Sequence, residues 1–181
     1  RAWAGNDGGI DGFVDAVYAT PEFVDTLATA TPVADHVDVD VELRGCPIDT
    51  GQLVELLTAT AIGRRPQLPS EAVCVQCKRA GVVCVMVSRG EPCLGPIISS
   101  GCNALCPGMA RGCYGCFGPR ESANGCSLAR WYGDALEMSD ERVAAKFAGF
   151  TGWAPELREV IDSKGGPPGM RVQVAADAAE P

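Results

Sequence analysis

Residues 74–116 read CVQCKRAGVVCVMVSRGEPCLGPIISSGCNALCPGMARGCYGC, and this stretch decides how the rest of the sequence is interpreted. Eight of the ten cysteines of the chain lie in it, in two consecutive groups of four. The spacings are Cys74-x2-Cys77-x6-Cys84-x8-Cys93 and Cys102-x3-Cys106-x6-Cys113-x2-Cys116. The two thiolates of a C-x2-C pair can point at one metal centre, and two more distant thiolates complete its shell. The spacing therefore predicts two metal centres.

Three chemistries use cysteines at this density. Disulfides are typical of secreted chains that have a small core, and this chain shows no signal segment and has apolar residues enough for a core. Structural zinc suits the two C-x2-C pairs but not the other spacings. Four-iron clusters suit four thiolates each, and glycines at 95, 101, 108, 112, 115 and 118 would let backbone N–H groups approach sulfur. We expect two [4Fe–4S] clusters, with zinc and disulfides as alternatives; eight unligated thiols so closely grouped would be unusual.

Length and composition set limits on the fold and on the partners. The chain has 181 residues, of which 46% are hydrophobic and 21% charged, so we expect one full domain or two small ones. The net charge of −8 argues against nucleic acid or an anionic membrane surface as the main partner. No apolar run approaches the roughly 18 residues of a membrane span. Because the chain begins at Arg1 without a methionine, we expect it to be part of a longer protein.

The residues before the cysteine-rich stretch predict the last piece of an α/β domain over 1–63. Residues 1–30 have a helical pattern, with a first-turn proline at Pro21. Residues 37–43 (VDVDVEL) alternate apolar and acidic side chains, which is typical of a strand with one wet face. Asp49 or Thr50 then caps a helix that continues to Ala61 and stops at Gly63.

Residues 64–126 are rich in Cys, Gly and Pro and show weak periodicity, so we expect an irregular cluster domain, entered through a linker at 64–69. Residues 127–181 predict helices followed by a loose tail. Ser139 and Pro155 each have the character of a helix start, and the glycine- and proline-rich run from Gly165 ends the ordered part.

Several other residues are expected to have structural rather than catalytic roles. We expect Cys126 to be an ordinary thiol and His36, the one histidine, to lie in a surface loop. Asp38, Asp40 and Glu42 resemble a carboxylate site, but their spacing predicts a solvated strand face. The tryptophans are expected in packing or subunit contacts. Basic residues between the cysteines either balance the charge of thiolate-bound clusters or form a docking face for an acidic partner; they are Lys78, Arg79, Arg89, Arg111 and Arg120.

Four ordered motifs carry a resemblance to a known family. They are Arg44-Gly45-Cys46-Pro47, Val73–Arg79 (VCVQCKR), Pro92–Pro96 (PCLGP) and Gly112–Pro119 (GCYGCFGP). Together they resemble the small subunit of [NiFe] hydrogenases, and specifically the delta subunit of the cytoplasmic, NADP-linked sulfhydrogenase type. The resemblance extends through nearly all of residues 10–135.

The resemblance implies a flavodoxin-like domain, a cluster domain, and three iron–sulfur clusters in a row. Electrons would pass along them between a large subunit that holds the Ni–Fe site and a diaphorase or sulfur-reducing partner. Cys46 resembles the last ligand of the proximal cluster. The distal cluster would be bound by Cys74, Cys77, Cys84 and Cys93. The medial cluster would be bound by Cys102, Cys106, Cys113 and Cys116.

This sequence departs from the family at three points. Cys74 stands where periplasmic members have a histidine, and four cysteines at the medial position predict [4Fe–4S] rather than a three-iron cluster. Residues 1–45 contain no cysteine, so the proximal cluster needs further cysteines, which we expect upstream in a longer subunit.

The function predicted is therefore electron transfer within a hydrogenase, with no catalytic residue in this chain. No P-loop, G-x-G-x-x-G motif or Ser-His-Asp arrangement occurs, so nicotinamide and flavin would bind another subunit. The alternatives are a subunit of another respiratory-type redox complex and a zinc-binding interaction module without redox activity.

Overall fold

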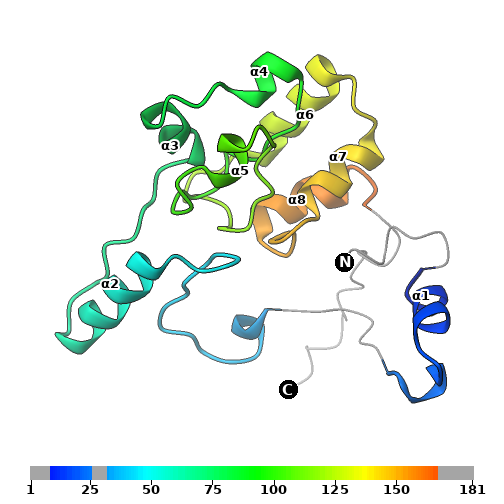
Figure 1. Ribbon diagram of the computed structural model, residues 1–181, viewed down its shortest axis with the longest axis horizontal. Coiled ribbons are helices and arrows are strands. Elements are labelled where there is room, and N and C mark those ends of the chain that lie inside the picture. Colours follow the sequence, from blue (N-terminus) through cyan, green and yellow to red (C-terminus); the bar gives the residue numbers. More distant parts are fainter. Residues whose placement is uncertain (1–8, 26–31, 167–181) are drawn as a thin grey trace, which may run out of the picture.

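The chain is mostly helical (Figure 1). The computed structural model describes residues 9–25 and 32–166. The helices are α1 (Gly9–Val17), α2 (Thr50–Ala61), α3 (Val73–Arg79), α4 (Val85–Arg89), α5 (Leu105–Gly108), α6 (Gly125–Leu136), α7 (Asp140–Phe147) and α8 (Pro155–Ser163), with 3-10 turns at Pro21–Phe23 and Val33–Asp35.

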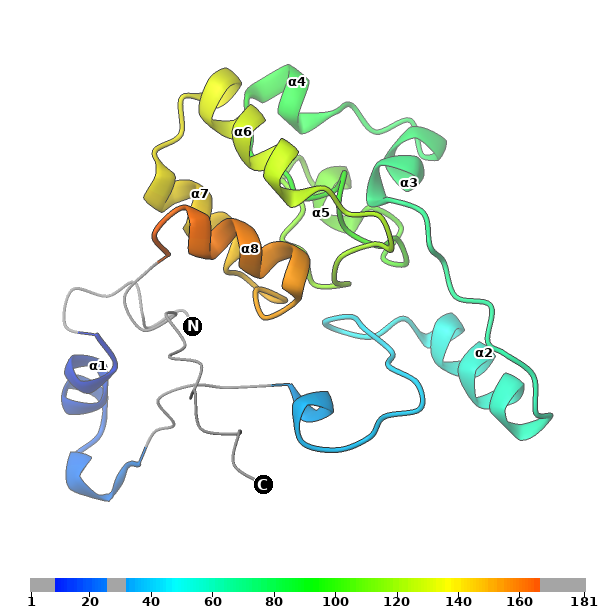
Figure 2. The same cartoon turned by 180° about the vertical axis from the view of Figure 1, so that it is seen from behind.

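One apolar core joins the cysteine-rich segment to the three helices that follow it. Helices α6, α7 and α8 contact one another, and the loops and short helices of the cysteine-rich segment lie against them (Figures 1 and 2). The largest fully buried side chains come from both parts; they are Tyr132, Phe147, Leu94, Ile98, Leu157, Ile161, Val73, Val143 and Val160. The irregular segment therefore does not need a core of its own.

The helix starts after residue 126 follow the predicted chemistry. The Ser139 hydroxyl accepts a hydrogen bond from the Arg142 N–H at 3.4 Å and caps α7, with Asp140 and Glu141 in its first turn. Helix α8 begins at Pro155, which needs no hydrogen-bond donor at that position. Helix α6 begins at Gly125, slightly before the predicted boundary.

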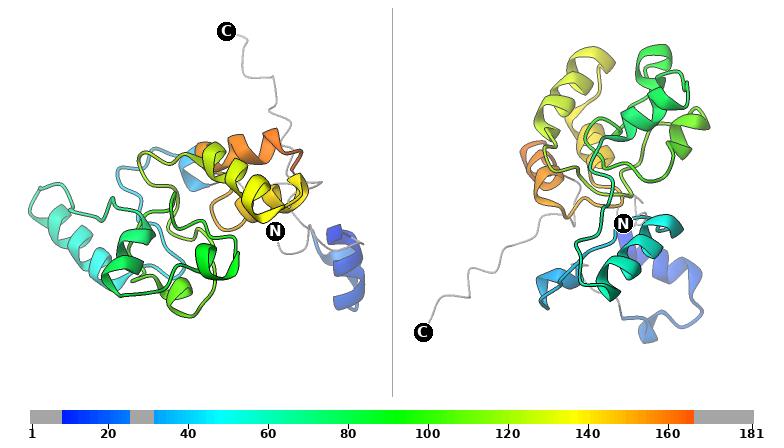
Figure 3. Two further views of the ribbon diagram at one scale, coloured as in Figure 1. Left: turned by 90° about the horizontal axis from the view of Figure 1, so that it is seen from above. Right: turned by 90° about the vertical axis from the view of Figure 1, so that its left-hand side faces the viewer.

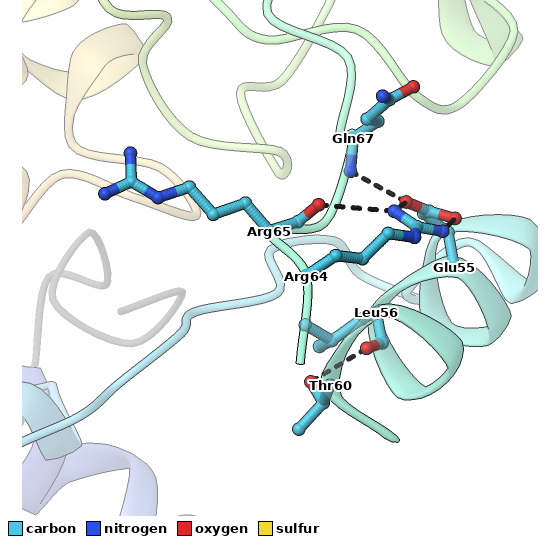
Figure 4. A network of polar contacts seen from close by, with 6 residues as sticks. All are labelled: Glu55, Leu56, Thr60, Arg64, Arg65 and Gln67. Carbon is cyan, nitrogen blue, oxygen red and sulfur yellow. Dashed lines mark hydrogen bonds and ion pairs between the residues drawn. The ribbon is translucent and has the colours of Figure 1, made fainter. Parts of the chain in front are cut away.

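Helix α2 also forms as predicted. The Asp49 carboxylate accepts the Gln52 N–H at 2.9 Å, and Gly63 follows the helix with a φ of +67°. The linker after it is tied back to the helix by Glu55, whose carboxylate accepts two hydrogen bonds from Arg64, at 2.5 and 2.7 Å, and one from the Gln67 N–H at 2.8 Å (Figure 4). These hydrogen bonds lower the pKa of Glu55 to about 2, that of Arg64 being the largest cause.

The strand predicted over 37–43 does not form, and that prediction is wrong. Within residues 9–25 and 32–166 the structure has two isolated β-bridges, Ala72 with Ser99 and Ile98 with Pro119, and no strand. Alternation of apolar and acidic residues suits one face of a sheet but does not supply a partner for the backbone hydrogen bonds. Val37, Val39 and Val41 are accordingly 42–55% exposed.

The N-terminal part follows its prediction in part. Helix α1 forms within the predicted helical region, and it lies apart from α3–α8 in every view (Figures 1 and 3). The predicted helix at Pro21 is only a 3-10 turn, and its continuation at Leu27 falls outside the described residues, as does the predicted tail beyond Gly166. None of the helices described is both long and apolar enough to span a bilayer.

Candidate iron–sulfur centre

The first four cysteines of the stretch form what we call the first thiol group. They come from helix α3, from the residue before α4 and from the loop at 93–95. Cys74 and Cys77 lie on α3, Cys84 directly precedes α4, and Cys93 is buried. A Cβ atom added at Gly95 would lie 3.3 Å from the Cys93 Sγ and 3.5 Å from the Cys74 Sγ. Burial raises the pKa of the Cys74 thiol to about 11, and the neighbouring thiolates of Cys93, Cys77 and Cys84 raise it further.

The loop at 98–100 holds α3 in place. The Val73 N–H donates to the Ile98 carbonyl at 3.0 Å, and the Ser100 N–H donates to the Glu71 carbonyl at 2.8 Å. Gln76, between the two cysteines of α3, accepts hydrogen bonds from the N–H groups of Gly101 (3.2 Å) and Ala104 (3.3 Å). Gln76 therefore fastens the C-x2-C turn to the loop that carries Cys102.

The second thiol group consists of Cys102, Cys106, Cys113 and Cys116. Burial raises the pKa of Cys113 to about 12; a hydrogen bond from the Gly115 backbone opposes the rise, and the thiolates of Cys93, Cys102 and Cys116 add to it. Burial likewise raises the pKa of Cys106 and of Cys116. Gly115 has a φ of +87°, a conformation that glycine adopts without strain.

The two thiol groups meet at Cys93 and Cys113. The Cys113 N–H donates to the Cys93 Sγ at 3.1 Å, and the Leu94 N–H donates to the Cys113 carbonyl at 3.2 Å. Gly112 makes this approach possible, because a Cβ atom there would lie 2.0 Å from the Pro92 carbonyl oxygen. A backbone hydrogen bond thus links ligand candidates of both groups.

This close approach predicts a large effect of a single methyl group. We expect Gly112→Ala to force the segments at 92–93 and 112–113 apart, to lower the stability by about 1–3 kcal/mol and to reduce metal retention. Gly108→Ala is the matched control, since a Cβ atom at Gly108 meets no atom within 4 Å. Urea unfolding and metal analysis of both variants check this; equal behaviour of the two would contradict it.

Cys46 lies beside the second group. It is exposed, but a hydrogen bond from its backbone opposes the rise in the pKa of Cys116 that burial causes. Its loop packs closely against the cysteine-rich segment. A Cβ atom added at Gly45 would lie 3.1 Å from the Phe117 ring, and one added at Gly118 would lie 2.7 Å from the Arg44 side chain. The structure thus brings the Gly-Cys-Pro loop to Cys116 although some 70 residues separate them.

Positive charge reaches both groups. Burial raises the pKa of Cys74 and of Cys106; the charge of Lys78 opposes the rise at Cys74, and the charges of Arg111 and Lys146 oppose the rise at Cys106. Lys146, on α7, is half-buried, and its Nζ lies 4.7 Å from the centre of the Tyr114 ring. Arg79 instead pairs with Glu71.

Three residues were missed by the sequence reasoning: Gln76, Lys146 and Tyr132. Tyr132 is fully buried on α6, beside the thiols of both groups. Leu128, Ala129 and Tyr132 have the spacing of a buried helix face, and a buried tyrosine hydroxyl normally has a polar partner. That pattern could have identified Tyr132, whereas only the tertiary structure brings Lys146 to the cysteines.

The remaining candidates lie away from the two groups. Cys126 is exposed on the first turn of α6. His36 and the acidic residues of 38–42 are exposed. Trp153 donates a hydrogen bond to Asp35 at 2.7 Å and lies under the Arg158 guanidinium at 4.8 Å, which fits the packing role predicted for the tryptophans.

Comparison with known proteins finds hydrogenase subunits. No family model matches the sequence. The chain is 36% identical over 127 residues to the sulfhydrogenase 2 subunit delta of Pyrococcus furiosus, covering 70% of this chain and 53% of that protein. It is 33% identical over 147 residues to a subunit of the F420-non-reducing hydrogenase of Methanococcus voltae, covering 66% of this chain and 49% of that protein.

A third relative carries the cofactor class in its name. The chain is 28% identical over 127 residues to the iron-sulfur subunit of the F420-non-reducing hydrogenase of Archaeoglobus profundus, covering 55% of this chain and 38% of that protein. The chain spans about half the length of the first two relatives. The predicted resemblance is confirmed at the level of hydrogenase subunits.

Proposed function

We propose that this chain is the iron–sulfur electron-transfer part of a [NiFe] hydrogenase small subunit of the cytoplasmic sulfhydrogenase type. It would relay electrons between a large subunit that holds the Ni–Fe centre and a diaphorase or sulfur-reducing partner. The observation that carries the proposal is the pair of thiol groups that meet at the Cys113 N–H to Cys93 Sγ hydrogen bond of 3.1 Å. The names of the relatives support the hydrogenase assignment.

The donor set fits two four-iron clusters. Among the residues that the structure describes, no three His, Cys, Asp or Glu side chains converge on a single metal-ion position. In a four-iron cluster each thiolate binds a different iron atom, and each thiol group offers four cysteines for that purpose. The first thiol group would hold the distal cluster and the second the medial cluster. Such clusters accept and release one electron at a time.

The protein's own contribution is burial, hydrogen bonding and charge. Backbone N–H groups of Cys113, Gly115 and Cys46 are directed at the sulfur atoms of Cys93, Cys113 and Cys116, respectively. Such donors and nearby cations stabilise negative charge and raise a reduction potential. The raised pKa values of the free thiols mean that metal binding must displace their protons.

The position of Cys46 beside Cys116 supports a third, proximal cluster next to the second group. Cys46 would supply one ligand, and the other three would come from outside this chain. We propose the same division as the sequence suggested: an end piece of a flavodoxin-like domain at 1–63, a cluster domain at 64–126, and C-terminal helices and a tail at 127–181.

Metal analysis tests the proposal. Purified without oxygen after expression with iron–sulfur assembly proteins, the chain should contain about eight iron atoms and eight acid-labile sulfides. The reduced protein should show the electron paramagnetic resonance (EPR) signals of two interacting clusters. Two zinc ions without sulfide would identify the zinc-binding alternative and end the redox proposal.

A further inference from the structure

Tyr132 carries a buried hydroxyl whose proton has no acceptor among the described residues. The exposed fraction of the residue is 0%, and its ring makes edge contacts with Trp131 and Phe147, with centroids at 6.1 and 6.0 Å. The hydroxyl is shielded from water and makes no hydrogen bond of normal geometry. A hydroxyl that is buried without a hydrogen-bond partner destabilises the fold, so its position calls for an acceptor.

The surroundings of the hydroxyl show which acceptor is at hand. Burial raises the pKa of Tyr132, and the negative charges that raise it further belong to Cys93, Cys113 and Cys74. The backbone N–H of Cys93 faces the hydroxyl oxygen and opposes the rise in this pKa, but an N–H cannot accept the hydroxyl proton. Two of the three thiols belong to the first thiol group, and Cys93 has the strongest effect. Tyr132 also shares one buried cluster with Cys93 and Cys113, the two residues at which the thiol groups meet.

We propose that the Tyr132 hydroxyl donates a hydrogen bond to sulfur of the cluster held by Cys74, Cys77, Cys84 and Cys93, and thereby raises the reduction potential of that cluster. This inference rests on the proposed function. Reduction adds negative charge to the cluster, and a donor at sulfur stabilises the reduced form more than the oxidised one. Sulfur is then the acceptor of the otherwise unpaired hydroxyl proton.

Tyr114 provides a matched control. It directly follows Cys113, but it is 42% exposed, and Lys146 lies over its ring. Removing its hydroxyl deletes the same atom close to the same centres without removing a buried donor.

The test is a redox titration of the full chain, followed by EPR, for wild type, Tyr132→Phe and Tyr114→Phe. Tyr132→Phe should keep its iron and sulfide and shift one cluster to a more negative potential. The other cluster should change little, and Tyr114→Phe should leave both unchanged. Incorporation of 3-fluorotyrosine at 132 makes the hydroxyl a stronger donor and should shift the same cluster to a more positive potential.

The outcomes distinguish a failure of the proposed function from a failure of the hydrogen bond proposed for Tyr132. A wild-type chain without sulfide removes the proposed function and this inference with it. Clusters present at full content but with an unchanged potential in Tyr132→Phe overturn the inference alone. If Tyr132→Phe loses iron, the fluorotyrosine variant decides: a positive shift supports hydrogen bonding, and no shift shows that Tyr132 only packs the core.

Discussion

Cys113→Ala should reduce the iron and sulfide content of the anaerobically purified chain from about eight to about four of each. Cys113 is 5% exposed and supplies both a thiol of the second group and the N–H that bonds to Cys93. Alanine keeps the N–H but removes one of four ligands, so the second cluster is lost while the first persists. Iron and sulfide analysis, with EPR on the reduced protein, measures the loss.

The same change should destabilise the segment from 64 to 126, because metal binding contributes free energy of folding. Hydrogen exchange should therefore show faster opening around 102–116. Cys126→Ser is the control, since Cys126 is exposed and lies outside both groups, and we expect its iron content to equal that of wild type. Loss of iron in Cys126→Ser, or full iron in Cys113→Ala, would show that the ligands are divided differently.

Phe147→Ala should lower the free energy of unfolding by about 3–5 kcal/mol. Phe147 is 1% exposed on α7, and a Cβ atom at Gly125 of α6 would touch its ring at 3.4 Å. Truncation leaves a cavity where α6 and α7 meet, beside the ring of Tyr132, with which Phe147 makes an edge contact. For a chain of this size the thermal midpoint should fall on the order of 10 °C.

Anaerobic thermal unfolding of the cluster-loaded protein, followed by circular dichroism, measures this effect. Phe150→Ala is the control: Phe150 lies just beyond α7 but is 58% exposed, and we expect its midpoint to stay close to that of wild type. Similar midpoints for the two variants would mean that the three C-terminal helices do not share the core described above.

Local signals predicted where helices α2, α7 and α8 begin. Asp49, Ser139 and Pro155 each occupy the capping or first-turn position that their side chains suggest, because a cap depends on a few neighbouring residues. The strand at 37–43 failed for the opposite reason. A strand needs backbone partners, and alternation along one segment says nothing about whether another segment lies beside it.

The same difference holds for the site. The spacing of the cysteines divides them into two groups of four from the sequence alone, and the C-x2-C turn at 74–77 forms on a short helix. The contact between the groups could not be predicted. It depends on the close approach of Gly112 to Pro92. The two residues are 20 positions apart, and no sequence motif indicates that they meet.

Residue types and short spacings were enough to identify the ligand candidates, the helix starts and the resemblance to hydrogenase subunits. Each of these depends on short sequence motifs. Tertiary packing was needed to show that Cys93 lies against Cys113, that Cys46 reaches Cys116, and that Tyr132 and Lys146 come to the thiols from helices α6 and α7. These contacts join distant segments, and they exist because one shared apolar core packs the three C-terminal helices against the cysteine-rich segment.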